Sequence, residues 1–234
     1  MVSIDYRDAL KYASTCKLLK RGAESEIRLC KFMGLDSVFK LRLRKPYMHP
    51  RLDSMLRSLR TRREARVIRD AIEGGVSAPL LYAVFPSIGL IVMEYIRGPR
   101  LKDVIDEGVK GVEEHAWEAG RQLGLLHRAG IVHGDPTTSN YIVGERLVLI
   151  DYGLAEYTTS IEERAVDLHL FRRAVESTHA RLAPTLYNAF LEGYRVVMGG
   201  EAYRVEERAD EIRLRGRYVE ERRRSVWSGV ADST

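Results

Sequence analysis

Amide side chains and cysteine are scarce in this chain of 234 residues. Asn140, Asn188 and Gln122 are its only asparagine and glutamine residues, a depletion typical of thermophilic proteins, in which charged residues replace thermolabile ones. The two cysteines, Cys16 and Cys30, form no CxxC motif. This spacing argues against a metal site built from cysteine.

The two cysteines still raise the question of a disulfide. If residues 16–31 form a hairpin that turns near Ala23, Cys16 and Cys30 lie opposite each other, and a cross-strand disulfide is geometrically conceivable. Intracellular proteins of hyperthermophiles do contain disulfides. The alternative is a pair of small buried hydrophobic side chains. We favour this alternative, and the sequence leaves both open.

Long hydrophobic runs are absent as well. The chain has no apolar stretch near the ~18 residues that suggest a membrane-spanning helix. Residues 1–17 carry charges throughout and lack the apolar core of a signal peptide. Apolar residues make up 45% of the chain and charged residues 30%, which indicates a soluble globular protein. We therefore expect a cytoplasmic protein with no membrane partner.

Positive charge is in modest excess, +5, but the arginines concentrate in two segments, 51–69 and 213–224. Such clusters attract phosphate groups, including those of nucleic acid. The alternative is a solvated surface with internal ion pairs, because the stretches RREAR and EERRR mix both signs. Both interpretations stay open for the first segment, and phosphate binding is favoured for the second.

Hydrophobic patterns divide the chain into two parts. The first part predicts a five-stranded sheet with one long helix at 52–73, and the expected strands are 15–22, 25–33, 36–45, 78–85 and 89–96. After Arg97–Arg100 the expected helices are 101–107, 112–128, 163–177, 184–198 and 201–215. We therefore predict an α+β fold with a β-rich N-lobe (1–96), an α-rich C-lobe (97–217) and a basic C-terminal tail (218–234).

Two motifs after residue 130 predict a cluster of oxygen-bearing side chains. HGDPTTSN contains Asp135 and Asn140, and LIDYG contains Asp151 after a short apolar strand. Asn140 and Asp151 are hard oxygen ligands that suit Mg²⁺ bound to a polyphosphate, and Asp135 could orient or deprotonate an attacking hydroxyl or water. The pair resembles the kinase H-x-D-x-x-x-x-N loop followed by D-F-G. The alternative, two Asx-rich turns of an unrelated fold, is disfavoured because both motifs occur together.

A kinase-like site also requires a lysine for the nucleotide phosphates and a carboxylate that holds this lysine. DSVFK supplies Lys40 on the third strand, and RTRREARVI supplies Glu64 on the long helix. An ordinary strand lysine and a surface glutamate paired with arginine are the alternatives. At the hinge, Met93, Glu94 and Ile96 would line the nucleotide, with adenine bonded to the backbone.

The glycine-rich loop is the main departure from a protein kinase. The turn between the first two strands reads KRGAESEI, so Gly22 and Ala23 are the only loop residues that we assign to the nucleotide. After DYGLAEY a helix follows almost at once without an A-P-E motif, which removes the platform for a peptide substrate. Asp167 on that helix could accept hydrogen bonds from the backbone of the HGD loop. His133 is expected to be structural, and Gly134 stands where ordinary kinases carry arginine.

The stretches GAESE, RTRREAR, IVMEYI, LHRAGIVHGDPTTSN and EIRLRGR, with the segment from IDYG to ESTH, together resemble the small atypical kinase of the KEOPS complex, the Bud-thirty-two family. The resemblance spans about residues 17–217. It implies a two-lobed minimal protein-kinase-like fold that binds ATP and Mg²⁺. The site residues that it implies are Lys40, Glu64, Asp135, Asn140 and Asp151. Pro136 is a departure, because leucine is usual after HGD.

The resemblance also implies a serine/threonine kinase or ATPase in a complex that makes threonylcarbamoyladenosine on tRNA. The implied partners are the universal tRNA threonylcarbamoyl-transferase subunit and a small accessory subunit bound through the N-lobe. The basic surface and the C-terminal tail would contact tRNA. The alternatives are a stand-alone phosphotransferase and a nucleotide-binding scaffold without required chemistry. The intact set of metal and base residues favours the first interpretation.

Overall fold

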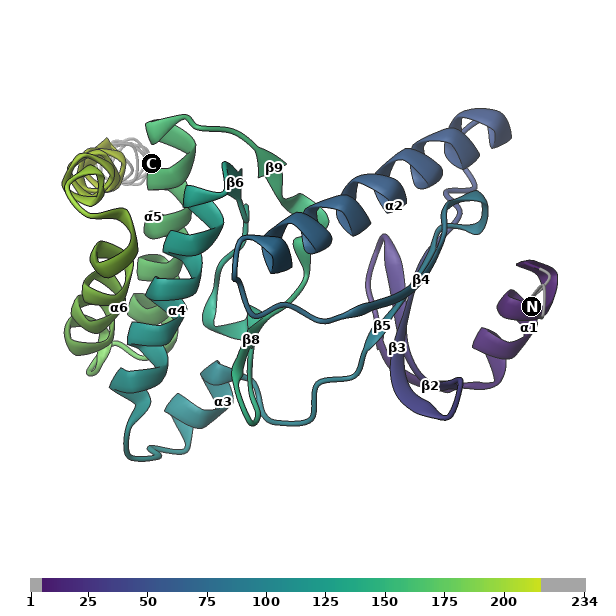
Figure 1. Cartoon of the computed structure of the whole chain (residues 1–234), viewed down its shortest axis with the longest axis horizontal. Coiled ribbons are helices and arrows are strands. Elements are labelled where there is room, and N and C mark those ends of the chain that lie inside the picture. Colours follow the sequence, from purple (N-terminus) through teal and green to yellow (C-terminus); the bar gives the residue numbers. More distant parts are fainter. Residues whose placement is uncertain (1–5, 216–234) are drawn as a thin grey trace, which may run out of the picture.

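The computed structural model describes residues 6–215 of the chain. A strand-rich lobe, here the sheet lobe, lies beside a helical lobe (Figure 1). The predicted basic tail (218–234) and its predicted contact with tRNA lie outside the described residues. Every helix within residues 6–215 is too short or too polar to cross a membrane.

The sheet lobe contains one antiparallel sheet with the strand order β1-β2-β3-β5-β4. Its strands are β1 (Lys17–Arg21), β2 (Ser25–Phe32), β3 (Leu35–Arg42), β4 (Leu81–Phe85) and β5 (Leu90–Glu94), and the 3₁₀ turn η1 (Pro86–Ile88) joins the last two. This sheet confirms the predicted fold class. The long helix α2 (Pro50–Glu73) was also predicted, but α1 (Tyr6–Thr15) was not.

Both faces of this sheet are covered, which explains why β5 is apolar at consecutive positions. Leu90 and Val92 pack with Ala9 and Ala13 of α1 on one face. Ile91 and its neighbour two residues on, Met93, pack with a residue of α2 on the other face. Because successive side chains of a strand point to opposite faces, a strand covered on both sides needs no polar alternation.

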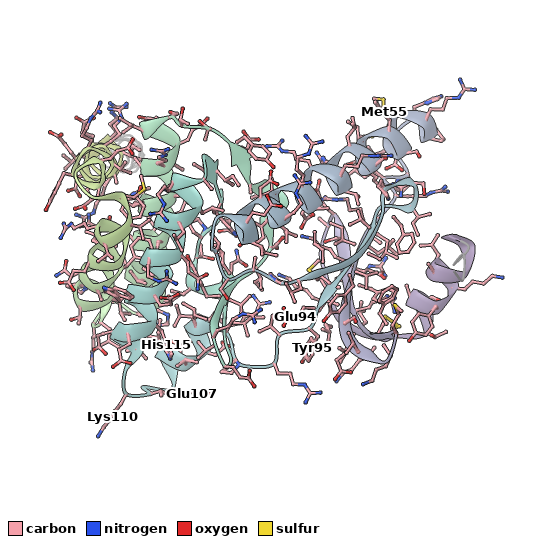
Figure 2. The ribbon with its side chains drawn as sticks, in the orientation of Figure 1. Met55, Glu94, Tyr95, Glu107, Lys110 and His115 are labelled. Carbon is pink, nitrogen blue, oxygen red and sulfur yellow. A yellow bond between two sulfur atoms is a disulfide. The ribbon has the colours of Figure 1, made fainter. Side chains whose placement is uncertain are left out.

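A disulfide joins Cys16 and Cys30, with 5.2 Å between their Cα atoms (Figure 2). Lys17 of β1 pairs with Leu29 of β2, so the residue before β1 lies opposite Cys30. The pattern of small buried side chains favoured above is therefore wrong in this structure, because the hairpin register brings the two sulfur atoms together.

The helical lobe contains α3 (Leu101–Asp106), α4 (Val112–Arg128), α5 (Ile161–Thr178), α6 (Ala183–Met198) and a further helix over residues 201–215. All of these were predicted, within two residues at their ends. Phe171 of α5 stacks on Phe190 of α6, with 3.8 Å between ring centres. At Gly193 of α6 a Cβ atom would lie 1.9 Å from the carbonyl oxygen of Trp117 on α4, so this close helix contact requires glycine.

Short strands and turns of the helical lobe carry the two predicted motifs. They are β6 (Ile131–Val132), η2 (Thr138–Asn140), β7 (Tyr141–Val143), β8 (Leu147–Leu149), η3 (Tyr152–Leu154) and β9 (Glu156–Tyr157). β6 pairs with β9, and β7 pairs with β8. The HGDPTTSN motif therefore begins directly after β6 and ends directly before β7.

Helix α2 belongs to the hydrophobic cores of both lobes. Ala65 packs against β5 of the sheet, whereas Val67, Ile68 and Ala71 are part of the main core of the helical lobe. Arg63 donates a hydrogen bond to the carbonyl oxygen of Ala155, at 3.0 Å, in the segment after the DYG motif. The position of this helix is thus fixed from both sides, which matters because it carries Glu64.

Candidate active site

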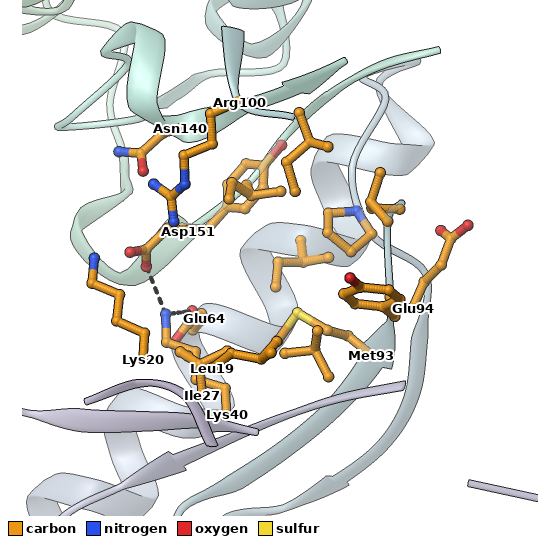
Figure 3. Close-up of a pocket in the computed structure, with 18 residues that line it drawn as sticks. Leu19, Lys20, Ile27, Lys40, Glu64, Met93, Glu94, Arg100, Asn140 and Asp151 are labelled. Carbon is orange, nitrogen blue, oxygen red and sulfur yellow. Dashed lines mark hydrogen bonds and ion pairs between the residues drawn. The ribbon is translucent and has the colours of Figure 1, made fainter. Parts of the chain in front are cut away.

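A cavity of about 210 Å³ opens between the sheet and the β7–β8 hairpin (Figure 3). Its charged and amide lining residues are Lys20, Lys40, Glu64, Glu94, Arg100, Asn140 and Asp151. The fold brings these residues together from distant parts of the sequence. Lys40, Glu64, Asn140 and Asp151 are residues that the motifs predicted.

Lys40 lies at the centre of an ionic network that is buried at Glu64 and Arg42 and open to the cavity at Asp151. Its Nζ atom lies 2.5 Å from Glu64 Oε1 and 2.6 Å from Asp151 Oδ1. Arg42, two residues further along β3 and hence on the same face of the strand, binds the second oxygen of Glu64 at 2.5 Å. Glu64 is only 2% exposed, and a buried carboxylate requires partners for its charge. Lys40 and Arg42 provide them, one at each oxygen atom. The sequence analysis predicted the lysine and the glutamate but missed Arg42.

The charges of this network stabilise one another. Burial acts to lower the pKa of the Lys40 ammonium, but the Glu64 and Asp151 carboxylates outweigh it and raise this pKa above its ordinary value. Burial likewise acts to raise the pKa of Asp151, yet the charge and hydrogen bond of Lys40 hold it below its ordinary value. Lys40 is therefore a cation and Asp151 an anion at neutral pH.

The β7–β8 hairpin explains why Asn140 and Asp151 meet. Tyr141 pairs with Leu149, and the backbone N–H of Ile150 donates to the carbonyl oxygen of Asn140 at 2.8 Å. The two motif residues therefore leave the hairpin at the same end. Asp151 has φ 66° and ψ 67°, in the left-handed region, which aspartate tolerates better than most residues.

Asn140 connects the cavity to Asp135. Its Nδ2 atom donates to Asp135 Oδ2 and to the carbonyl oxygen of Asp135, each at 2.8 Å. This assignment leaves the Oδ1 atom of Asn140 free to act as a ligand on the cavity side. Asp135 itself does not line the cavity.

The donor set fits a magnesium ion that is shared with a phosphate ligand. Within residues 6–215, no three His, Cys, Asp or Glu side chains gather in a way that could hold a metal by themselves. Asn140 Oδ1 and the Asp151 carboxylate provide two hard oxygen donors in one cavity. Mg²⁺ is usually bound by one or two carboxylates and completed by phosphate oxygens and water.

Asp167 of α5 holds the loop that carries Asp135 through hydrogen bonds to its backbone. Asp167 is 1% exposed, and its carboxylate accepts hydrogen bonds from the backbone N–H groups of His133, at 2.6 Å, and Gly134, at 2.8 Å. His127 of α4 approaches the same carboxylate at 3.1 Å. The expected interaction of Asp167 with the loop backbone is therefore present.

His133 has the structural position that was expected. Its Nε2 atom lies 3.2 Å from the carbonyl oxygen of Ile150, and its Nδ1 atom accepts the backbone N–H of Asp135 at 3.3 Å. This pattern requires the neutral ring with the proton on Nε2. Burial lowers the pKa of His133, which is consistent with the neutral form.

Glycine is required at position 134 for a steric reason that the sequence did not reveal. Its φ is +80°, and a Cβ atom there would lie 2.8 Å from the carbonyl oxygen of Leu154. A side chain at this position would therefore be strained and would collide with the backbone that follows the DYG motif.

The remaining predicted nucleotide residues divide into two groups. Met93, Glu94 and Ile96 line the cavity, as predicted for the hinge. Gly22 and Ala23 lie in the β1–β2 turn and are not among the lining residues. Lys20 of β1 and Arg100 before α3 line the cavity instead, and the sequence analysis assigned neither to the site.

Comparison with known proteins identifies the family. The model of the RIO domain matches residues 30–179, which include Lys40, Glu64 and both motifs. The KEOPS complex subunit Bud32 of Pyrococcus abyssi is 45% identical over 215 residues, covering 87% of this chain and 97% of that protein. The chain belongs to the Bud32 family of RIO-domain proteins. The resemblance inferred from the sequence is thereby confirmed.

Two further comparisons extend this result. The chain is 39% identical over 204 residues to a "probable bifunctional tRNA threonylcarbamoyladenosine biosynthesis protein" of Methanothermobacter thermautotrophicus. The match covers 87% of this chain but only 37% of that longer protein. A solved structure of WaaP in complex with acyl carrier protein superposes with a TM-score of 0.56 at 19% identity, covering 87% of this chain and 92% of WaaP. That likeness supports the fold alone.

Proposed function

We propose that this chain carries out ATP-dependent phosphoryl transfer within a KEOPS-type complex that makes threonylcarbamoyladenosine on tRNA. One observation carries the chemical part of this proposal: the Lys40–Glu64 pair and the oxygen donors Asn140 and Asp151 line one cavity. These are the parts that a phosphoryl-transfer site requires. The names of the Pyrococcus and Methanothermobacter relatives support the biological part.

In the proposed reaction, Asp135 accepts the proton of the attacking hydroxyl as its oxygen bonds to the γ-phosphorus of ATP. The bond between that phosphorus and the bridging oxygen breaks, and ADP leaves with the electron pair. Asn140 orients Asp135 through its two hydrogen bonds. Lys40 contacts phosphate oxygens while Glu64 holds its ammonium in place. Asn140 and Asp151 would hold Mg²⁺, which would supply positive charge to the phosphates.

The acceptor is either water or a serine or threonine hydroxyl. α5 begins at Ile161, shortly after the DYG motif, so the chain offers little surface on which to lay a peptide. A partner or tRNA would then complete the site. We infer that the universal threonylcarbamoyl-transferase subunit and the small accessory subunit, the latter bound to the sheet lobe (1–96), are these partners in the cytoplasm. The helical lobe (97–217) supplies Asp135, Asn140 and Asp151 to the reaction.

The decisive experiment measures ATP turnover by Asp151→Ala and by the wild type, alone, with the partner subunit, and with partner and tRNA. Loss of the carboxylate should abolish turnover and tRNA modification. The complex should still assemble, because the Asp151 side chain lines the cavity, is 53% exposed and is not part of the hydrophobic core. Glu145→Ala is the matched control, since Glu145 is an exposed acid in the turn of the same hairpin. Unchanged tRNA modification by Asp151→Ala would refute a catalytic role and leave a scaffold.

The same assay separates the two acceptors. Release of inorganic phosphate that depends on tRNA indicates hydrolysis, and transfer of phosphate to serine or threonine indicates kinase activity.

A further inference from the structure

Strand β1 carries a bulge at the mouth of the cavity. Leu18 pairs with Arg28 and Lys20 pairs with Ile27, so Leu19 is the extra residue between them. Adjacent residues of a regular strand point to opposite faces, but Leu19 and Lys20 both line the cavity. The bulge therefore turns the Lys20 side chain toward the site.

The charge of Lys20 is not used within the part of the chain that the structure describes. Lys31 and Lys40, which also lie on the sheet, each pair with a carboxylate. Lys17 and Lys20 of β1 have no such partner among residues 6–215. Figure 3 shows the ammonium group of Lys20 directed toward Asp151, on the side of the cavity where Asn140 also lies.

Arg100 brings a second cation from the opposite lobe. Its Nη1 atom donates to the carbonyl oxygen of Ser139 at 2.6 Å, and it forms no ion pair within residues 6–215. Its guanidinium is also directed toward Asp151 in Figure 3. Two cations without carboxylate partners beside a pair of magnesium donors match a ligand with several negative charges.

One backbone amide of the β1–β2 turn is not available for the usual phosphate contact. The backbone N–H of Gly22 already donates to the carbonyl oxygen of Ser25 at 2.9 Å. This amide is therefore occupied within the turn and is not free to bind a phosphate oxygen, as amides of a glycine-rich loop do.

We propose that Lys20, turned inward by the bulge, binds the β- and γ-phosphates of the nucleotide in place of a glycine-rich loop. This inference rests on the proposed function, because it takes the ligand to be a nucleoside triphosphate. Arg100 supports the same phosphates from the helical lobe. Arg100 also holds the loop before Asn140, so its substitution would disturb more than one contact, and Lys20 is the cleaner position to test.

The test compares the affinities of ATP, ADP, AMP and adenosine, each with Mg²⁺, by titration calorimetry on the full chain. Lys20→Met should weaken ATP binding about tenfold or more, because a charged hydrogen bond to phosphate is lost, and should leave adenosine affinity unchanged. Lys20→Arg should retain most of the ATP affinity. Lys17→Met is the matched control, since it removes an exposed lysine from the same strand outside the cavity.

The outcomes separate this inference from the proposed function. If the wild type binds ATP and Lys20→Met binds it equally well, the role of Lys20 is refuted and the proposed function stands. Equal weakening of ATP and adenosine would mean a distorted cavity and would also refute a phosphate contact. If the wild type binds neither ATP nor adenosine, both proposals fail.

Discussion

The two walls of the cavity hold their functional groups in different ways. On the helical wall, the loop with Asp135 is anchored on the buried carboxylate of Asp167 through two backbone hydrogen bonds. On the sheet wall, all five residues of β1 are exposed, and the strand pairs only with β2 at the edge of the sheet. The helical wall is fixed by buried polar contacts. On the sheet wall Lys40 of β3 is likewise held by Glu64, but β1 is an edge strand exposed to solvent.

This difference assigns a separate task to each wall. Groups that stabilise a transition state act best when their positions are fixed before the reaction, which buried and satisfied hydrogen bonds achieve. Segments with exposed backbone and few buried contacts open at low free-energy cost, and this is where ligands enter. We therefore expect the helical wall to determine the rate of the reaction and β1 to determine the binding and release of phosphates.

The largest expected effect is the loss of the anchor itself, in Asp167→Ala. The substitution leaves the backbone N–H groups of His133 and Gly134 and the buried ring of His127 without their acceptor. At about 1–3 kcal/mol for each unsatisfied buried polar group, it should lower the free energy of unfolding by about 3–5 kcal/mol. Urea denaturation measures this change. Asp210→Ala is the control, because its exposed carboxylate pairs with Arg172 and should be worth only about 0–1 kcal/mol. A loss no larger than that of the control would mean that the loop is held by other contacts.

Reduction of the disulfide should have an intermediate effect and act on the opposite wall. Cys16 and Cys30 are separated by 14 residues, and closing a loop of this size stabilises a protein by about 3 kcal/mol in the chain-entropy model. Since Cys16 directly precedes β1, we also expect weaker ATP binding after reduction, at unchanged maximal turnover.

The measurement compares unfolding and ATP affinity with and without a reducing agent. The double variant Cys16→Ser and Cys30→Ser controls for other effects of the reagent and should respond to neither condition. If the wild type responds as little as the variant, β1 does not depend on the covalent link.

The residues that the sequence could predict and those that it could not occur on both walls. The HGD and DYG motifs are short and local, so the positions of Asp135, Asn140 and Asp151 followed from their spacing and one hairpin. Lys40 and Glu64 followed from the order of strand and helix. These predictions depended on short motifs and on the order of the elements along the chain.

The features that were missed depend on register and tertiary packing. A β-bulge has no reliable sequence signal, so Lys20 was not assigned to the cavity. The pairing of Cys16 with Cys30 depended on the exact hairpin register. Arg42 binds Glu64 only because β3 and α2 pack together. Helix α1 is an exception, because Ala9, Leu10 and Ala13 recur at a spacing that could have predicted it.

The smallest expected effect tests how far the anchoring of the helical wall extends. Tyr194 of α6 lies 2.9 Å from Nδ1 of His127, whose Nε2 faces the Asp167 carboxylate. Burial lowers the pKa of His127 and raises that of Tyr194, so the ring is neutral and the hydroxyl keeps its proton. Both oxygens of the Asp167 carboxylate accept backbone N–H groups, so the proton of His127 lies on Nε2 and Tyr194 must donate to Nδ1.

Tyr194→Phe removes this donor and leaves a buried nitrogen unpaired, which should cost about 1 kcal/mol of stability. The expected change in maximal turnover is also small, because Asp167 retains its bonds to the loop. Tyr203→Phe is the matched control, since the Tyr203 side chain is 64% exposed, and it should change neither quantity. Turnover that falls much further than stability would mean that Tyr194 positions the loop through His127 and Asp167. Equal behaviour of the two variants would show that the anchor ends at Asp167.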